Sequence, residues 1–88
     1  MRVSDKDLEE IRNMMAKYFI NFPYRVQSEA GRVYLQSETG RDDLTSRDTK
    51  QELAYKMWNM MRLLDRINDG ELKLGGDSIG RTAARNEP

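Results

Sequence analysis

Residues 49–70 read TKQELAYKMWNMMRLLDRINDG, the longest stretch of helical periodicity in the chain. Its apolar residues recur at spacings of 4, 3, 4 and 3 at Leu53, Met57, Met60, Leu64 and Ile67, with Ala54, Trp58 and Met61 in a neighbouring row. Such spacings place the side chains on one wide face of an α-helix. Gly70 follows the last apolar position and suits the left-handed residue that ends a helix. The pattern predicts an amphipathic helix that ends near Gly70.

The start of this helix has two alternatives, one turn apart. Thr45 with Asp48, and Thr49 with Glu52, both have the spacing of a capping box. In that motif the hydroxyl accepts a hydrogen bond from a backbone N–H three residues later, and the later side chain accepts one in return. The sequence leaves both starts open.

A second amphipathic helix is predicted at about residues 5–21. Ser4 and Asp7 have capping-box spacing, and four acidic residues in the first turns suit the positive end of the helix dipole. Apolar residues recur at spacings of three and four at Leu8, Ile11, Met15, Tyr18 and Phe22. Pro23 ends the helix, because the residue before a proline avoids the α conformation.

Between the two helices the sequence predicts a β-hairpin. Residues 24–28 (YRVQS) and 32–36 (RVYLQ) alternate apolar with polar side chains, and Gly31 suits the left-handed position of the turn. A helical conformation of this segment remains the alternative. Residues 37–46 are polar and are predicted to be a loop. Two strands alone are only marginally stable, so the hairpin must pack on a helix.

These elements define the predicted fold class: α+β, mainly helical, with two amphipathic helices flanking a small hairpin in the order α-β-β-α. We expect one domain over residues 1–74 and a flexible C-terminal tail over residues 75–88. The helices carry more apolar surface than one hairpin can cover, and large exposed apolar patches are rare on monomers. We therefore expect a symmetric dimer or higher oligomer with a helical-bundle core.

Methionine is abundant, and its position has two interpretations. Five of the six methionines, Met14, Met15, Met57, Met60 and Met61, lie in the predicted helices. The favoured interpretation is that they fill an irregular dimer core; the alternative is an adaptable groove for a partner helix. Trp58 has the same two interpretations, closing the core under the hairpin or anchoring an interface, and the first is slightly favoured.

Composition argues against catalysis. The chain contains no Cys and no His, which excludes thiolate nucleophiles, thiolate metal sites and the usual general base. The carboxylate pairs Asp42–Asp43 and Asp65–Asp69 offer few ligands for a cation, and arginines alternate with the second pair. We expect a protein that is not an enzyme and needs no metal and no cofactor.

The charge balance limits the classes of partner. Fifteen basic and fifteen acidic residues leave no net field to attract nucleic acid or an anionic membrane. No apolar run approaches the ~18 residues of a membrane span, and the N-terminus lacks the apolar region of a secretory signal. We expect a cytoplasmic protein without a membrane partner.

Arginine and tyrosine side chains gather in the predicted hairpin region. The candidate partner- or ligand-binding residues are Tyr24, Arg25, Arg32, Tyr34 and Arg41. Arginine forms bidentate contacts with phosphate or carboxylate, and tyrosine rings stack on bases. A solvated hairpin of mixed charge is the plainer interpretation, because several carboxylates lie in the same stretch.

The residues expected in an oligomer interface or core are Leu8, Ile11, Met15, Tyr18, Leu53, Met57, Trp58, Met60, Leu64 and Ile67. The sequence thus predicts a small non-enzymatic protein that binds itself and another protein. It would act as an inhibitor, adaptor or regulator, of the type that phages and mobile elements encode. The alternative is a protein that binds nucleotides or nucleic acid through the hairpin arginines and tyrosines.

Overall fold

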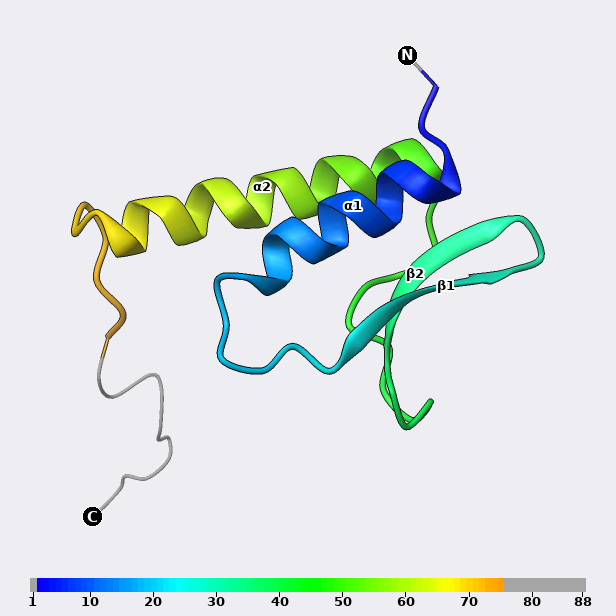
Figure 1. Ribbon diagram of the computed structural model, residues 1–88, viewed down its shortest axis with the longest axis horizontal. Coiled ribbons are helices and arrows are strands. Elements are labelled where there is room, and N and C mark those ends of the chain that lie inside the picture. Colours follow the sequence, from blue (N-terminus) through cyan, green and yellow to red (C-terminus); the bar gives the residue numbers. More distant parts are fainter. Residues whose placement is uncertain (1, 76–88) are drawn as a thin grey trace.

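The structure, a computed structural model, describes residues 2–75 and contains two helices and two strands (Figure 1). The elements are α1 (Asp5–Ala16), β1 (Tyr24–Glu29), β2 (Arg32–Ser37) and α2 (Lys50–Asn68). The predicted α-β-β-α order with an antiparallel hairpin is confirmed, while oligomeric packing stays a prediction. The predicted tail lies outside the described residues, except for Gly75.

Both helices begin at capping boxes. The Asp7 N–H donates to Ser4 Oγ at 3.1 Å, and the Ser4 N–H donates to Asp7 Oδ2 at 3.0 Å. Thr49 and Glu52 make the same reciprocal pair at 3.1 and 2.9 Å. Of the two starts that the sequence left open for α2, the structure therefore has the second. The hydroxyl of Thr45 instead accepts a hydrogen bond from the Leu35 N–H at 3.0 Å.

Helix α1 ends earlier than predicted, at Ala16. Backbone N–H groups of residues 17–19 donate to carbonyls three residues earlier, which tightens the chain into turns. The Arg12 guanidinium then donates to the carbonyls of Phe22 and Tyr24, at 2.9 and 2.8 Å. These bonds hold the reversal that brings β1 back beneath α1, and a longer helix would not permit it.

Helix α2 ends at the predicted glycine. Gly70 has a φ of +86°, and its N–H donates to the Ile67 carbonyl. The Glu71 N–H donates to the Arg66 carbonyl at 2.9 Å. This pair of bonds is the Schellman arrangement, which satisfies carbonyls that the helix leaves free.

The hairpin turns on two residues, both in the left-handed region. Ala30 has a φ of +53° and Gly31 a φ of +78°, between the paired residues Glu29 and Arg32. Positive φ at both central positions is the type I′ turn, whose twist matches that of the strands. Glycine adopts this conformation freely, but the Cβ of Ala30 makes it strained.

Strand β2 is hydrogen-bonded on both edges, because residues 42–48, of which residues 42–46 were expected to be loop, run along its second edge. Val33 and Asp48 exchange backbone hydrogen bonds at 2.8 and 2.9 Å. The Leu44 N–H donates to the Leu35 carbonyl at 2.8 Å. This segment forms only isolated bridges with β2 and no regular strand. It nevertheless satisfies the backbone of the most buried strand.

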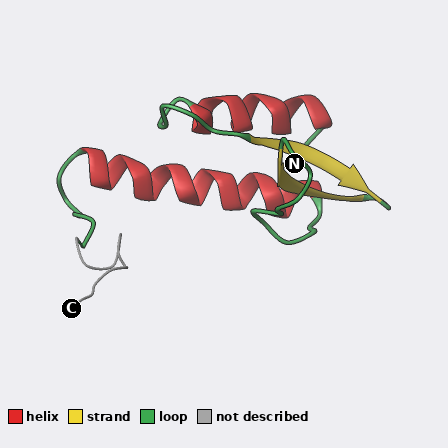
Figure 2. Cartoon of the chain, turned by 90° about the horizontal axis from the view of Figure 1, so that it is seen from below, coloured by secondary structure: helices red, strands yellow, loops and turns green. Residues whose placement is uncertain are grey.

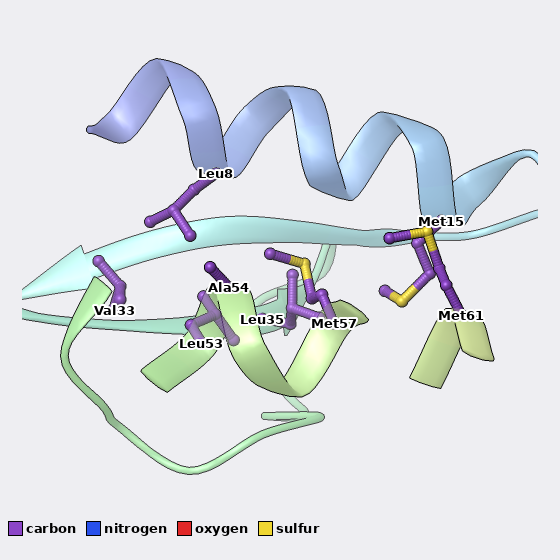
Figure 3. Packing of buried hydrophobic residues seen from close by; sticks show 8 residues of the cluster. All are labelled: Leu8, Met15, Val33, Leu35, Leu53, Ala54, Met57 and Met61. Carbon is purple, nitrogen blue, oxygen red and sulfur yellow. The ribbon is translucent and has the colours of Figure 1, made fainter. Parts of the chain in front are cut away.

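The two helices lie side by side with their N-termini at the same end, and the hairpin packs across one face of the pair (Figures 1 and 2). Asp5 and Lys50 form an ion pair of 3.2 Å at that end. Among residues 2–75, the buried core cluster consists of side chains from α1, β2 and α2: Leu8, Met15, Val33, Leu35, Leu53, Ala54, Met57 and Met61 (Figure 3). Each helix therefore buries the stripe that faces the hairpin.

One ion pair joins α2 to the segment beside β2. Lys56 Nζ lies 2.6 Å from a carboxylate oxygen of Asp48, whose side chain is only 13% exposed. Ser46 Oγ donates to the other oxygen at 3.0 Å. The hydrogen bond from Lys56, with a smaller contribution from Ser46, lowers the pKa of Asp48 below its ordinary value of 3.8.

The strained turn generates a first prediction. Ala30→Asn is expected to raise the free energy of unfolding by about 1 kcal/mol, because asparagine tolerates the left-handed conformation better than alanine. Thermal unfolding at a fixed protein concentration would show an increase of roughly 4–8 °C. Gly31→Ala is the control: no atom lies within 4 Å of the added Cβ, so only backbone strain acts, and the midpoint should fall. Equal midpoints for Ala30→Asn and the parent would contradict this account of the turn.

The carboxylates generate a prediction on pH. The pKa values of Asp7, Asp48 and Glu52 are all lowered, the first and last chiefly by the backbone hydrogen bonds of their capping boxes. A carboxyl group with a lower pKa in the folded state stabilises the fold above its ordinary pKa. That stabilisation is lost as the pH falls through the folded value. The free energy of unfolding should therefore decrease below about pH 5.

Urea unfolding at a series of pH values measures this decrease. Asp48→Asn should flatten the acid side of the profile, and Lys56→Met should have the same effect. The two substitutions together should cost less than the sum of their separate costs, because they remove one interaction. A profile of Asp48→Asn that follows the parent down to pH 2–3 would contradict the role of this ion pair.

Candidate functional site

The face of the helix pair opposite the hairpin carries an open groove. It has a volume of about 610 Å³ and lies between α1 and α2. Its apolar lining residues are Val3, Ile11, Met14, Ala54, Tyr55 and Trp58, and its polar ones are Asp7, Glu10, Gln51 and Glu52. We call this surface the α1/α2 groove.

Helical periodicity explains why the groove is lined this way. On α2, the positions Gln51, Tyr55 and Trp58 are spaced by four and three residues, and they lie about 100° around the helix from the core stripe. On α1, Asp7 and Met14 are one heptad apart and share a side of the helix. Each helix thus has a buried stripe beneath the hairpin and a second, partly apolar stripe that the hairpin does not reach.

Large side chains in the groove are exposed. Met14 is 42% exposed, Trp58 44% and Tyr55 67%. Trp58 is the single tryptophan of the chain. Exposed apolar side chains are common when they are scattered, whereas these three large side chains lie along one groove.

The groove continues past its centre toward the C-terminal ends of the helices. The second half is lined by Met14, Lys17, Tyr18, Trp58, Met61, Arg62 and Asp65. Met14 and Trp58 line both halves and therefore lie at the centre. Tyr18 Oη donates to a carboxylate oxygen of Asp65 at 2.5 Å, which joins the turn after α1 to α2 at this end. This hydrogen bond raises the pKa of Tyr18.

The two halves carry opposite charge. The half near the helix N-termini holds three carboxylates, those of Asp7, Glu10 and Glu52, and we call it the acidic end. The other half holds Lys17 and Arg62 with one carboxylate, that of Asp65, and we call it the basic end. The acidic end stays charged well below neutral pH, because capping hydrogen bonds lower the pKa of two of its three carboxylates.

The hairpin residues predicted to bind a partner do not form one surface. Tyr34 is buried, with the Arg47 guanidinium 4.4 Å from the centre of its ring, so it is not available for a ligand. Cross-strand pairing places Arg25 and Arg32 on the face that Tyr34 shares. Tyr24 points to the opposite face, toward the helices, where it contacts the core.

The remaining predicted binding residues are exposed and spread out. Arg25 Nε lies 3.7 Å from a carboxylate oxygen of Glu38. Arg32 lies at the end of β2 beside the turn, while Arg41 lies in the loop that follows β2. Strand alternation thus separates Tyr24 from the others, and burial removes Tyr34 from the surface, while binding by the exposed arginines stays a prediction.

The residues expected in an interface or core occupy three environments. Leu8, Met15, Leu53 and Met57 are buried, and Ile11, Tyr18, Met60, Leu64 and Ile67 are half-buried. Trp58 is exposed, so the favoured expectation that it closes the core under the hairpin is wrong. Its position on α2 turns its side chain into the α1/α2 groove, on the other side of the helix pair.

Sequence reasoning missed two features of the molecule. It did not assign Tyr55 or Glu10 to any site, although their spacing from Trp58 and Met14 by three and four residues would have indicated shared helix faces. It also missed Arg47, which lies over Tyr34 and pairs with Glu29 at 3.1 Å. Arg47 is distant in sequence from both strands, so no local pattern points to this contact.

Within residues 2–75 no group of three or more metal-binding side chains comes together, and neither helix is long and apolar enough to cross a membrane. Comparison with known proteins found no relative. The chain matches no protein-family model, no curated protein and no solved structure.

Proposed function

We propose that this chain is a small non-enzymatic binding protein that acts by contact with another macromolecule, as an inhibitor, adaptor or regulator. The α1/α2 groove is its contact surface. The observation that carries this proposal is the exposure of Met14, Tyr55 and Trp58 along one groove. Aromatic side chains and methionine are enriched at the centres of protein interfaces.

The shape of the groove favours an α-helical partner. Two helices packed side by side leave a furrow, and the side-chain ridge of a further helix fits into such a furrow. Methionine adapts its shape to a docked surface, while tryptophan contributes a large apolar area. A partner helix with an apolar stripe would cover Met14 and Trp58 together.

The chemistry of the groove supports a non-catalytic role. A general acid or base at neutral pH needs a pKa near 7. The pKa values of Asp7 and Glu52 are instead lowered, because both carboxylates accept the capping hydrogen bonds of their helices. These two groups hold no proton at neutral pH, and they serve to start the helices.

Binding of nucleotides or nucleic acid through the hairpin has weaker support. Arg25 and Arg32 share one exposed face, but Tyr34 is unavailable for stacking on a base and Glu38 lies beside Arg25. The two functions differ in their response to salt. Binding to phosphates weakens steeply between about 50 and 200 mM salt, whereas an apolar groove contact weakens little.

Site-specific photo-crosslinking tests the proposed function. With p-benzoylphenylalanine in place of Tyr55, irradiation of cells that produce the protein should give an adduct of defined mass. The same group in place of Leu63 is the matched control, because Leu63 is 52% exposed on α2 but does not line the groove. We expect an adduct from position 55 and none from position 63.

Trp58→Asp should abolish the adduct from position 55 without unfolding the chain, since the tryptophan side chain lies outside the core. Circular dichroism and the midpoint of thermal unfolding check that the fold is retained. Folded protein that gives no adduct from position 55 or from position 14 would refute the groove as the contact surface.

A further inference from the structure

We propose that the occupant of the α1/α2 groove is a second copy of this chain, docked face to face and antiparallel across a two-fold axis beside Met14 and Trp58. The inference rests on the proposed function, in which the groove is a contact surface. It adds the identity of the partner, its orientation and the position of the axis.

Charge complementarity favours the antiparallel orientation. In that orientation the acidic end of one copy, with Asp7, Glu10 and Glu52, meets the basic end of the other, with Lys17 and Arg62. The two-fold axis makes the same contact twice. The parallel orientation would instead bring the carboxylates of the two acidic ends together, where they repel each other.

The spacing of the charges agrees with the position of the axis. In the sequence of α1, Met14 lies about midway between Glu10 and Lys17. In the sequence of α2, Trp58 lies about midway between Glu52 and Arg62. A two-fold axis across the helices at these central residues sets α1 against α1 of the other copy. Glu10 then lies near Lys17 of the second copy, and Glu52 near its Arg62.

The helix dipoles favour the same arrangement. The helices α1 and α2 begin at the same end, where Asp5 pairs with Lys50, so their dipoles run in the same direction within one copy. Side-by-side parallel dipoles repel weakly. An antiparallel second copy places the positive helix N-termini of each chain next to the negative C-termini of the other.

Such a dimer would cover the exposed side chains of the groove. Met14 and Trp58 would meet their own symmetry mates at the axis, where methionine packs against methionine and the tryptophan rings can stack. Four helices would form the centre, as in an antiparallel bundle. The two hairpins would lie on the outer sides, with Arg25 and Arg32 still free to contact a third molecule.

Sedimentation velocity on the purified chain tests the inference, with the emission of Trp58 as a second readout. We expect a species of twice 10.3 kDa at micromolar concentration and a blue shift of the emission as the dimer forms. Trp58→Asp should give a folded monomer. Leu63→Glu, on the other side of α2, should leave the dimer intact.

A charge exchange tests the orientation. Glu10→Lys and Lys17→Glu alone should each raise the dimer Kd about tenfold, because every dimer contains two copies of the pair. An equimolar mixture of the two single variants should form a heterodimer with nearly parental affinity. The double variant should also recover it. In a parallel dimer position 10 would face position 10, so the single variants would not weaken the dimer and the mixture would bind more tightly than the parent. Weakening by each single variant together with recovery to parental affinity therefore identifies the antiparallel arrangement.

A monomer at 100 µM would overturn the inference. If position 55 still formed an adduct with another macromolecule, the proposed function would survive this result. A dimer that neither charge variant weakens, or that the mixture fails to restore, would overturn the antiparallel arrangement. Loss of both the dimer and every adduct in the folded parent chain would overturn the inference and the proposed function together.

Discussion

A hairpin of two six-residue strands can cover only one face of a helix pair, and the architecture follows from this constraint. The side chains of Val33 and Leu35 fill the space between hairpin and helices, and both are essentially inaccessible to solvent. Within residues 2–75 no such layer covers the opposite face of α1 and α2. The apolar side chains on that face, Met14 and Trp58 above all, are exposed, and they carry the contact surface that we propose.

Strand β2 is stable at the centre of the fold because all its neighbours contribute hydrogen bonds or packing. Its first edge pairs with β1, and its second edge is satisfied by Asp48, Leu44 and Thr45. A buried strand with a free edge would leave polar backbone groups without partners, at a cost of ~1–3 kcal/mol each. The irregular segment after β2 is therefore a structural part of the sheet.

The charge pattern of the groove arises from the way the helices begin. Both capping boxes use a carboxylate three residues after the cap, at Asp7 and Glu52, and helices that start at the same end bring those carboxylates together. Asp7 and Glu52 thus serve both helix formation and the acidic end of the groove. Lys17 is the C-cap residue of α1, where positive charge suits the negative end of the helix dipole, while Arg62 lies ten residues beyond Glu52 on α2.

Sequence alone determined what depends on neighbours three or four residues apart: the capping boxes, the helix end at Gly70, the turn at Gly31 and the core stripes through Leu8 and Leu53. It did not determine which of two capping boxes starts α2, where α1 ends, or which apolar stripe remains exposed. Those outcomes depend on contacts between distant residues, such as Thr45 with Leu35. The exposure of Tyr34 and Trp58 was also decided by tertiary packing. Arg47 covers Tyr34 on the outer face of the hairpin, and Trp58 stays exposed because the hairpin covers the other side of the helices.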